Sequence, residues 1–453
     1  MKVENRSIDY IPENERHGEP RSLFFVWFGA NANITTVAAG VLPVSLGLNL
    51  FWSVLAIVLG SLIGAVFMAS HSAQGPRLGI PQMIQSRAQF GVYGAIVPLL
   101  FVMLIYLGFF VSNTLLAAQA VAAASPFGNG VNIVLLGLAC FLVALFGYNL
   151  IHRFQKVLSL ASIGVFGIAT VFALALPTAP GQWALQGFDG VAFLASMSIA
   201  VTWQLSYAPY VADYSRYLPT RTSTRQVFWY SYLGTVLGGS WMMVLGALLA
   251  KGMAGFSDNV GLNLVGFLGG STLLTFAFVL YGQVAINVFN LYGAFMSTVT
   301  VIEPFAALKV TPRVRAGFML VICAAATGLC TLAQDDFLQF FLNFIFFMSY
   351  FLIPWTAINL VDYYALRKGE YRIADIFAPS GIYGRVNGIA VAVFLATIVL
   401  EVPFMSTSLY VGPVARSLQG IDLAWAVGLL FPALAYYALM SRRKPLASAP
   451  AKG

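Results

Sequence analysis

Charged residues are scarce in this sequence of 453 residues, where Lys, Arg, Asp and Glu together account for only 9%. The hydrophobic fraction is 59%, and this combination excludes an ordinary soluble globular protein. The N-terminal 23 residues carry mixed charge without an apolar core, so they are expected to form a tail and not a cleaved signal peptide.

Cysteine and histidine are also rare, with three residues of each. The cysteines have no paired spacing, so disulfides and a metal cluster are not expected, and the sequence predicts neither a cofactor nor a metal site. The histidines are expected to be solvated, in the tail or at the cytoplasmic ends of spans, and this role is favoured over a proton relay or a metal ligand. These residues are Cys140, Cys323 and Cys330, and His17, His71 and His152.

Long apolar runs take up most of the chain. A membrane-spanning helix needs about 20 mostly apolar residues, and twelve such windows can be drawn. The sequence therefore predicts an all-α polytopic membrane protein with about 12 transmembrane helices. The windows are 24–47, 50–71, 96–122, 132–150, 157–177, 190–211, 228–250, 272–300, 314–333, 338–360, 388–408 and 423–440.

The Lys and Arg residues indicate the orientation of these spans. With both termini in the cytoplasm, 22 of the 24 basic residues fall in cytoplasmic segments, all except Lys251 and Arg416. Short loops favour the cell (inner) membrane, with cytoplasmic tails at 1–23 and 441–453. The net charge of +8 follows from this topology, so no nucleic-acid partner is expected.

Spans 1 and 6 are interrupted by polar residues or a helix breaker. Span 1 contains Gly29 and Asn31 in a run of small and amide residues, and span 6 contains Pro209. Interruptions five spans apart are typical of two inverted five-helix repeats, whose substrate and ion bind near the breaks. We therefore assign 24–177 to a first repeat, 190–360 to a second and 388–440 to two further helices.

Polar side chains at membrane depth also mark spans 3, 6 and 8 as candidate binding segments. In span 3, Phe109 and Asn113 lie four residues apart and share a helix face. An aromatic ring and an amide can hold a flat heterocycle by stacking and by paired hydrogen bonds. The other candidates are Trp203, Gln204 and Tyr207 in span 6, and Asn287 and Asn290, which form a stripe with Gln283, in span 8.

Structural roles remain open for all of these residues. Small residues and amides also form packing seams and hydrogen bonds between transmembrane helices. Glu401 is the acidic residue placed well inside a span, and a structural or interfacial role is favoured over a functional one. Asp213, Glu303 and Asp362 fall at cytoplasmic span ends, where ion pairing or capping is the commoner role.

Three strings of residues resemble the nucleobase–cation symporter family, in particular its purine–cytosine permease branch. They are 75–87 (GPRLGIPQMIQSR), 212–219 (ADYSRYLP) and 359–364 (NLVDYY), and the resemblance covers nearly the whole chain. It implies a LeuT-like fold with two C-terminal helices added. It also implies a site formed by the span 3 pair Phe109 and Asn113, a span 6 aromatic (Trp203 or Tyr207) and a span 8 amide, best Asn287.

The resemblance also implies secondary active import of a nucleobase, cytosine or a purine. Sodium-coupled members resemble one another in a Ser-Thr pair on span 8 that binds the ion together with span 1 carbonyls. This chain has Gly282 and Gln283 near that place, so the hydroxyl ligands are missing and H⁺ is favoured over Na⁺. The same fold could import another heterocycle, such as a thiamine precursor, a pyridoxine-like vitamin, allantoin or a hydantoin. A channel or sensor is a weaker alternative, and no catalytic constellation at membrane depth favours an enzyme.

Overall fold

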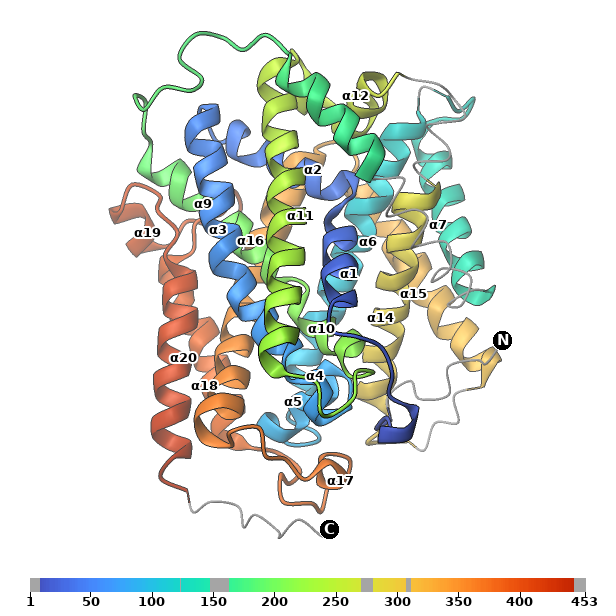
Figure 1. The fold of residues 1–453 in the computed structure, drawn as a ribbon, viewed down its shortest axis with the longest axis vertical. Coiled ribbons are helices and arrows are strands. Elements are labelled where there is room, and N and C mark those ends of the chain that lie inside the picture. Colours follow the sequence, from blue (N-terminus) through green and yellow to red (C-terminus); the bar gives the residue numbers. More distant parts are fainter. Residues whose placement is uncertain (1–8, 123, 147–162, 270–279, 307–310, 444–453) are drawn as a thin grey trace.

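The computed structural model describes residues 9–122, 124–146, 163–269, 280–306 and 311–443. Within these ranges the regular secondary structure is helical, apart from an isolated β-bridge between Ser406 and Val411. The long helices run roughly parallel to one another and form an upright bundle (Figure 1).

Each predicted span contains a helix in the part of the chain that is described. Seven helices are long and apolar enough to cross a membrane, a bent pair provides an eighth span, and four shorter apolar helices fall in the remaining windows. The spans are α1 (Ser22–Asn31) with α2 (Ile34–Ser45), α3 (Leu50–Ser72), α6 (Ile96–Val121), α7 (Asn129–Phe146), Ile163–Leu174, α9 (Gly190–Leu205) with α10 (Ala208–Ser215), α11 (Thr224–Gly252), α14 (Ala285–Ile302), α15 (Pro312–Ala333), α16 (Phe337–Leu360), α18 (Gly388–Glu401) and α20 (Ala424–Met440).

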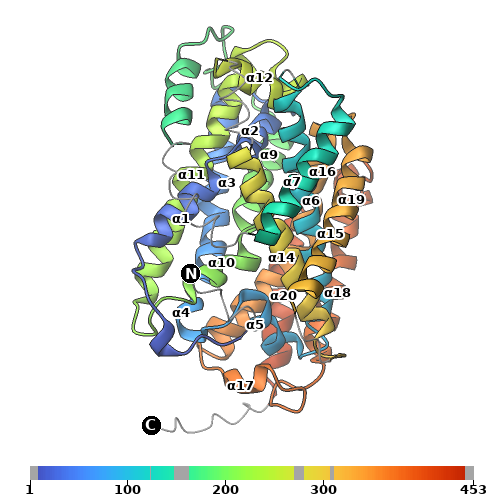
Figure 2. The same ribbon diagram turned by 90° about the vertical axis from the view of Figure 1, so that its right-hand side faces the viewer.

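Short helices mark the two ends of the bundle (Figure 2). At one end, called here the α5 end, lie α4 (Gly75–Leu78), α5 (Gln82–Phe90) and α17 (Ile373–Ile376); at the other, the α12 end, lie α12 (Val260–Phe267) and α19 (Pro413–Ser417). The chain enters α1 and leaves α20 at the α5 end (Figure 1). This arrangement fits an even number of spans. Lys251 ends α11 and Arg416 lies in α19, so both fall toward the α12 end.

Two groups of helices enclose the centre of the bundle. In the first, α1 and α2 pack on α11, and α3 packs on α9 and α11; in the second, α6 packs on α14, α15 and α7. Glycine allows close approach in the first group: a Cβ on Gly246 of α11 would collide with the carbonyl oxygen of Val37 in α2. Small residues at such seams let transmembrane helices pack backbone to backbone.

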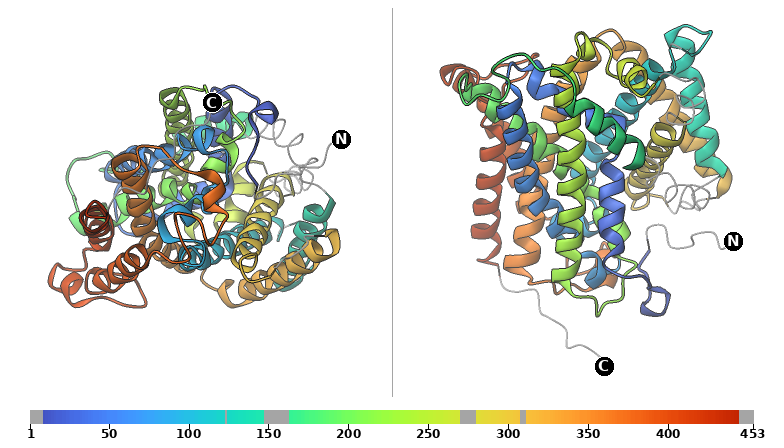
Figure 3. Two further views of the ribbon diagram at one scale, coloured as in Figure 1. Left: turned by 90° about the horizontal axis from the view of Figure 1, so that it is seen from below. Right: turned by 45° about the horizontal axis from the view of Figure 1, so that its top comes forward.

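The last two long helices lie at one flank of the bundle, drawn in orange and red in Figure 3. There α18 and α20 pack on each other and on α16. Glu401 ends α18 and is completely buried, and Gly428 of α20 faces its carboxylate, where a side chain would collide with it. Neither carboxylate oxygen has a hydrogen-bond partner in the described part of the chain. Glu401 therefore lies in the interface between helices and not at a solvated surface.

Candidate substrate site

Both predicted interruptions are present. At the first of them, side chains form hydrogen bonds with backbone groups that lack helical partners. The axes of α1 and α2 differ by 59°, with Ala32 and Asn33 between them. The Asn33 side chain accepts a hydrogen bond from the Thr36 amide at 3.0 Å, and its Nδ2 donates to the Ala30 carbonyl at 2.7 Å. Asn33 thus caps the start of α2 and also binds the end of α1.

The second interruption precedes the proline that predicted it. Helix α9 ends at Leu205 and α10 begins at Ala208, so Ser206 and Tyr207 form the break. The Ser206 hydroxyl donates to the Trp203 carbonyl at 2.7 Å. Pro209 sits in the first turn of α10, where its missing donor would have no helical partner in any case. The break lies where Pro209 cannot donate to the carbonyl of Leu205, the last residue of α9.

Asn31 joins the two breaks. It is fully buried, and its Oδ1 accepts hydrogen bonds from Trp203 Nε1 at 2.9 Å and from the Tyr207 hydroxyl at 3.1 Å. Its Nδ2 donates to the Trp27 carbonyl at 2.8 Å and to Thr235 Oγ1 at 3.2 Å. One amide therefore connects α1 to α9, to the α9–α10 break and to α11. The same contacts fix the orientation of two aromatic rings beside the breaks.

A second polar cluster links α2, α6 and α14. Asn113 Nδ2 donates to Asn287 Oδ1 at 3.0 Å, and Asn113 Oδ1 accepts a hydrogen bond from the Thr35 hydroxyl. Asn287 Nδ2 in turn donates to Thr114 Oγ1 at 2.9 Å. Asn290 Nδ2 approaches Asn287 Oδ1 at 3.4 Å. The π-helical turn Leu280–Val284 comes just before these amides in the sequence, and such turns are frequent at functional sites.

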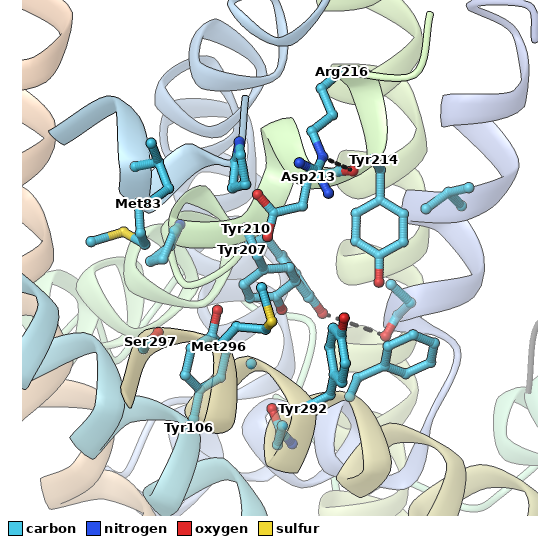
Figure 4. Close-up of a pocket in the computed structure, with 18 of the residues that line it drawn as sticks. Met83, Tyr106, Tyr207, Tyr210, Asp213, Tyr214, Arg216, Tyr292, Met296 and Ser297 are labelled. Atoms are coloured by element: carbon cyan, nitrogen blue, oxygen red, sulfur yellow. Dashed lines mark hydrogen bonds between the residues drawn. The ribbon is translucent and has the colours of Figure 1, made fainter. Parts of the chain in front are cut away.

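A pocket with a cavity volume of about 150 Å³ lies beside the breaks and reaches the start of α5. Figure 4 shows residues that line it. Its walls come from α1, the start of α5, α6, α10 and α14, and aromatic side chains dominate them. Trp27 and Tyr207 lie with ring centroids 5.6 Å apart, and Tyr106 and Tyr210 lie 6.0 Å apart. Asn290, Ser297 and Thr300 supply polar groups, and Asp213 and Arg216 complete the wall.

Packed aromatic rings separate this pocket from the α12 end. Phe109 meets Trp203 edge to face with centroids 5.8 Å apart, and Phe344 at 5.2 Å. Trp203 also meets Phe341 at 6.2 Å. These four residues, called here the aromatic layer, are each at most 9% exposed. The described conformation therefore places the pocket on the α5 side of the aromatic layer.

The candidate residues predicted from the sequence take three positions. Tyr207 and Asn290 line the pocket. Asn31, Asn113 and Asn287 lie in the two polar clusters, and Phe109 and Trp203 in the aromatic layer.

Gln204 and Gly29 take other positions. Gln204 turns toward α11, where its Nε2 donates to the Thr235 carbonyl at 3.2 Å and its Oε1 accepts from the Thr235 hydroxyl. The Gly29 carbonyl accepts the Ala32 amide at 3.1 Å and closes the end of α1. In this conformation both contribute to the framework and not to the pocket wall.

Several pocket residues were not among the candidates, and Trp27 is the most informative. Its Nε1 is buried without a hydrogen-bond partner in the described part of the chain, although its ring lines the pocket. Tyrosines of α6, α10 and α14 were also missed (Figure 4). Aromatic residues are common throughout this sequence, so the available signal was their helical spacing from polar residues, as for Trp27 four residues before Asn31.

The acidic residues at span ends have the partners expected from the sequence. Asp213 Oδ1 accepts the Gln82 amide at 2.8 Å and so caps α5, while Glu303 pairs with Arg87 at 2.9 Å and Asp362 with Arg367 at 2.9 Å. In the described part of the chain no group of three His, Cys, Asp or Glu residues could hold a metal ion.

The prediction of solvated histidines is wrong for His71. Its side chain is completely buried between α3, α5 and α16, because polar and aromatic partners replace water around the imidazole. His17 is exposed, as expected. His152 lies outside the described residues.

Comparison with known proteins gives a consistent picture. Residues 10–428 match a family model described as permease for cytosine/purines, uracil, thiamine, allantoin. The chain is 55% identical to the putative purine-cytosine permease YxlA of Bacillus subtilis (strain 168), over 98% of this chain and 97% of that protein. It is 26% identical to the purine-cytosine permease FCY21 of Saccharomyces cerevisiae, over 96% and 86% of the two chains.

The fold is that of a solved structure. The structure of Mhp1, a nucleobase-cation-symport-1 family transporter, in a closed conformation with bromovinylhydantoin bound, aligns with a TM-score of 0.76 at 18% identity. The alignment covers 99% of this chain and 98% of that chain. It confirms the predicted LeuT-like fold of twelve transmembrane helices. The boundaries drawn between the two repeats remain a prediction.

Proposed function

Since the chain belongs to the family of permeases for cytosine/purines, uracil, thiamine and allantoin, we propose that it imports a planar nucleobase, cytosine or a purine, together with a proton. The observation that carries this proposal is the aromatic pocket at the junction of the two helix breaks, bordered by the amides of α6 and α14. Both relatives named above, YxlA and FCY21, carry the name purine-cytosine permease, YxlA as a putative one. Family and structural neighbours are transporters, which points away from an enzyme.

The pocket supplies both kinds of contact that a nucleobase requires. The rings of Trp27, Tyr207 and Tyr210 offer faces for stacking, and Asn290 and the free Trp27 Nε1–H offer hydrogen bonds to the base edge. Each such bond replaces one to water, so its net contribution is about 1 kcal/mol. Selectivity comes from rejecting rings that leave a buried amide unpaired.

Alternating access supplies the remaining contacts. In the conformation described, Phe109 and Trp203 pack against each other, and Asn113 bonds to Asn287. Opening toward the α12 end would separate the aromatic layer and expose those same groups to a substrate arriving from that side. We place the α5 end in the cytoplasm, because the basic residues gather there. The described pocket then faces inward.

Proton coupling is supported by the residues before the span 8 amides. Sodium-coupled members that resemble this chain have a Ser-Thr pair near the position of Gly282 and Gln283. The two hydroxyl groups that would bind sodium are therefore missing here. Sodium is a hard cation that prefers oxygen ligands, as calcium and magnesium do. Sodium coupling through other oxygens is the alternative that the experiment below separates.

A second candidate is import of another heterocycle by the same fold. The family description includes thiamine and allantoin, and a pocket that stacks a ring and offers amide hydrogen bonds suits any flat molecule with donors and acceptors on its edge. A thiamine precursor, a pyridoxine-like vitamin, allantoin or a hydantoin would each meet that requirement.

Uptake of radiolabelled cytosine and adenine into proteoliposomes tests the proposal. We expect accumulation driven by an imposed inward proton gradient, collapse with a protonophore, no requirement for sodium, and competition by one nucleobase from a panel of unlabelled bases and vitamins. Accumulation that requires sodium would overturn the assignment of the proton as the coupling ion. If a vitamin or a hydantoin binds and no nucleobase is taken up, the substrate assignment would be overturned. The conclusion that the protein is a transporter would remain.

A further inference from the structure

His71 is a buried titratable side chain that the pocket itself does not use. It is completely buried in α3, and its ring stacks on Trp355 of α16 with centroids 4.8 Å apart and planes within 4°. A histidine in such a place changes charge near neutral pH only if its surroundings can bind both the neutral and the protonated ring. The hydrogen bonds around His71 provide that possibility.

Both ring nitrogens of His71 bond to uncharged side chains. Gln82 Nε2 lies 3.1 Å from Nδ1, and because an amide nitrogen can only donate, Nδ1 accepts this bond. The ring proton is therefore on Nε2, which donates to Thr356 Oγ1 at 3.3 Å. The imidazole is neutral in this arrangement. The acceptor atom of the same amide, Gln82 Oε1, is buried without a hydrogen-bond partner in the described part of the chain.

We propose that His71 binds the coupled proton and that the Gln82 amide rotates to accompany it. The proton adds to the lone pair of His71 Nδ1. A half-turn of the Gln82 amide then breaks the 3.4 Å hydrogen bond from its Nε2 to Gln85 Oε1 and presents Gln82 Oε1 as the acceptor of the new N–H bond. The hydrogen bond from His71 Nε2 to Thr356 Oγ1 is unchanged. Release of the proton to water restores the arrangement described here. This inference rests on the proton coupling of the proposed function and names the residue that performs it.

Gln82 connects this site to the substrate pocket. It is the first residue of α5, and its backbone amide donates to Asp213 Oδ1 at 2.8 Å. Asp213 lines the pocket, as do Pro81 and Met83 on either side of Gln82 (Figure 4). The residues on both sides of Gln82 in the sequence therefore belong to the pocket wall, so a rotation of its side chain takes place next to that wall. Protonation of His71 would therefore act on the substrate site through Gln82, its neighbours in α5 and Asp213.

Charged side chains also lie on the elements around His71, and none of them bonds to its ring nitrogens in the described part of the chain. The carboxylates favour the protonated ring and the guanidinium groups oppose it. Two of these groups are held in ion pairs, Arg87 with Glu303 and Asp362 with Arg367, which reduces their effect at a distance. The charged side chains on elements packed against this part of α3 are Asp213 and Arg216 of α10, Arg77 of α4, Arg87 of α5, Arg225 of α11 and Asp362, which follows α16.

Glu401 is a buried carboxyl that could also bind a proton, and the geometry does not favour it for this role. It lies between α18 and α20, and neither of its oxygens bonds to a side chain that leads to the pocket. His71 has such a connection through Gln82. The proton site is therefore assigned to α3 and α5 and not to the C-terminal helices.

The test uses the full chain in proteoliposomes with a trapped pH indicator. We expect His71→Gln to abolish substrate-dependent proton entry and accumulation against a gradient, while exchange of internal for external substrate continues at a rate within a few-fold of wild type. His17→Gln, an exposed histidine in the tail, is the matched control and should behave as wild type. Proton-coupled accumulation by His71→Gln would overturn the inference, and so would loss of exchange together with accumulation in a folded protein.

A second variant keeps the test decisive if His71→Gln does not fold. Gln82→Met retains size but removes the acceptor for the protonated ring, so accumulation should require a lower external pH than in wild type. An unchanged pH dependence would overturn the role of Gln82 and with it the inference. Wild-type protein that accumulates substrate without moving protons would instead refute the proton half of the proposed function.

Discussion

At the scale of single residues, the site consists of amides that bond to several elements at once. The sequence predicted Asn31, Asn113 and Asn287 because an amide at membrane depth is costly unless it has partners. It could not show that Gln204, an amide of the same kind, turns to Thr235 on α11. Periodicity gives the face of α9 on which Gln204 lies, but it does not show which neighbouring helix that face meets.

Removal of Asn113 should abolish substrate binding. In Asn113→Ala the bond to Asn287 is lost, and a buried acceptor loses its main partner, which costs about 1–3 kcal/mol. We expect no saturable uptake although the protein remains in the membrane. Asn129→Ala, which changes an exposed amide on α7, is the control and should transport normally. Normal uptake by Asn113→Ala would remove Asn113 from the site.

The free indole N–H of Trp27 gives a second residue-scale prediction. Trp27→Phe keeps a ring for stacking and removes one donor, so substrate affinity should fall by about 5-fold, the equivalent of one hydrogen bond. Trp27→Ala should reduce it further, because the stacking surface is also lost. Binding can be measured by isothermal titration in detergent. Equal affinities of Trp27→Phe and wild type would show that the indole does not contact the substrate.

At the scale of elements, the helices were predictable and their contacts were not. Apolar runs of about 20 residues fix where a chain can cross a bilayer, and the windows drawn from the sequence agree with the helices. The approach of α2 to α11, however, depends on glycines far apart in the chain, Gly40 and Gly246, whose added side chains would meet backbone atoms of the facing helix. A single sequence does not reveal such pairs.

Gly246→Val should destabilise the bundle. The new side chain would meet the Val37 carbonyl, which cannot move without shifting α2, and overpacking of this kind costs about 1–3 kcal/mol. We expect a lower melting temperature in detergent and less protein in the membrane. Gly328→Val on α15, where nothing lies within 4 Å of the added atom, should melt as wild type. Equal stability of both variants would show that the α2–α11 seam is not tight.

At the scale of the whole molecule, the basic residues predict which end faces the cytoplasm. With Cys140, Cys323 and Cys330 buried, the native thiols should react slowly with a membrane-impermeant maleimide. In intact cells we expect labelling of Arg416→Cys at the α12 end and none of Arg221→Cys, in the loop between α10 and α11, until the membrane is permeabilised. The opposite pattern would invert the topology and the direction in which the pocket faces.

The buried carboxyl of Glu401 also bears on how this protein is made. During synthesis α18 leaves the ribosome before α20, and a carboxyl exposed to lipid is costly for a helix on its own. Gly428 provides the space that shelters it, so α18 becomes fully compatible with the bilayer only when α20 has docked. The last two helices are thus expected to integrate as a pair. A nascent chain that stops before α20 would expose an acidic residue by which cellular quality control could recognise it as unfinished.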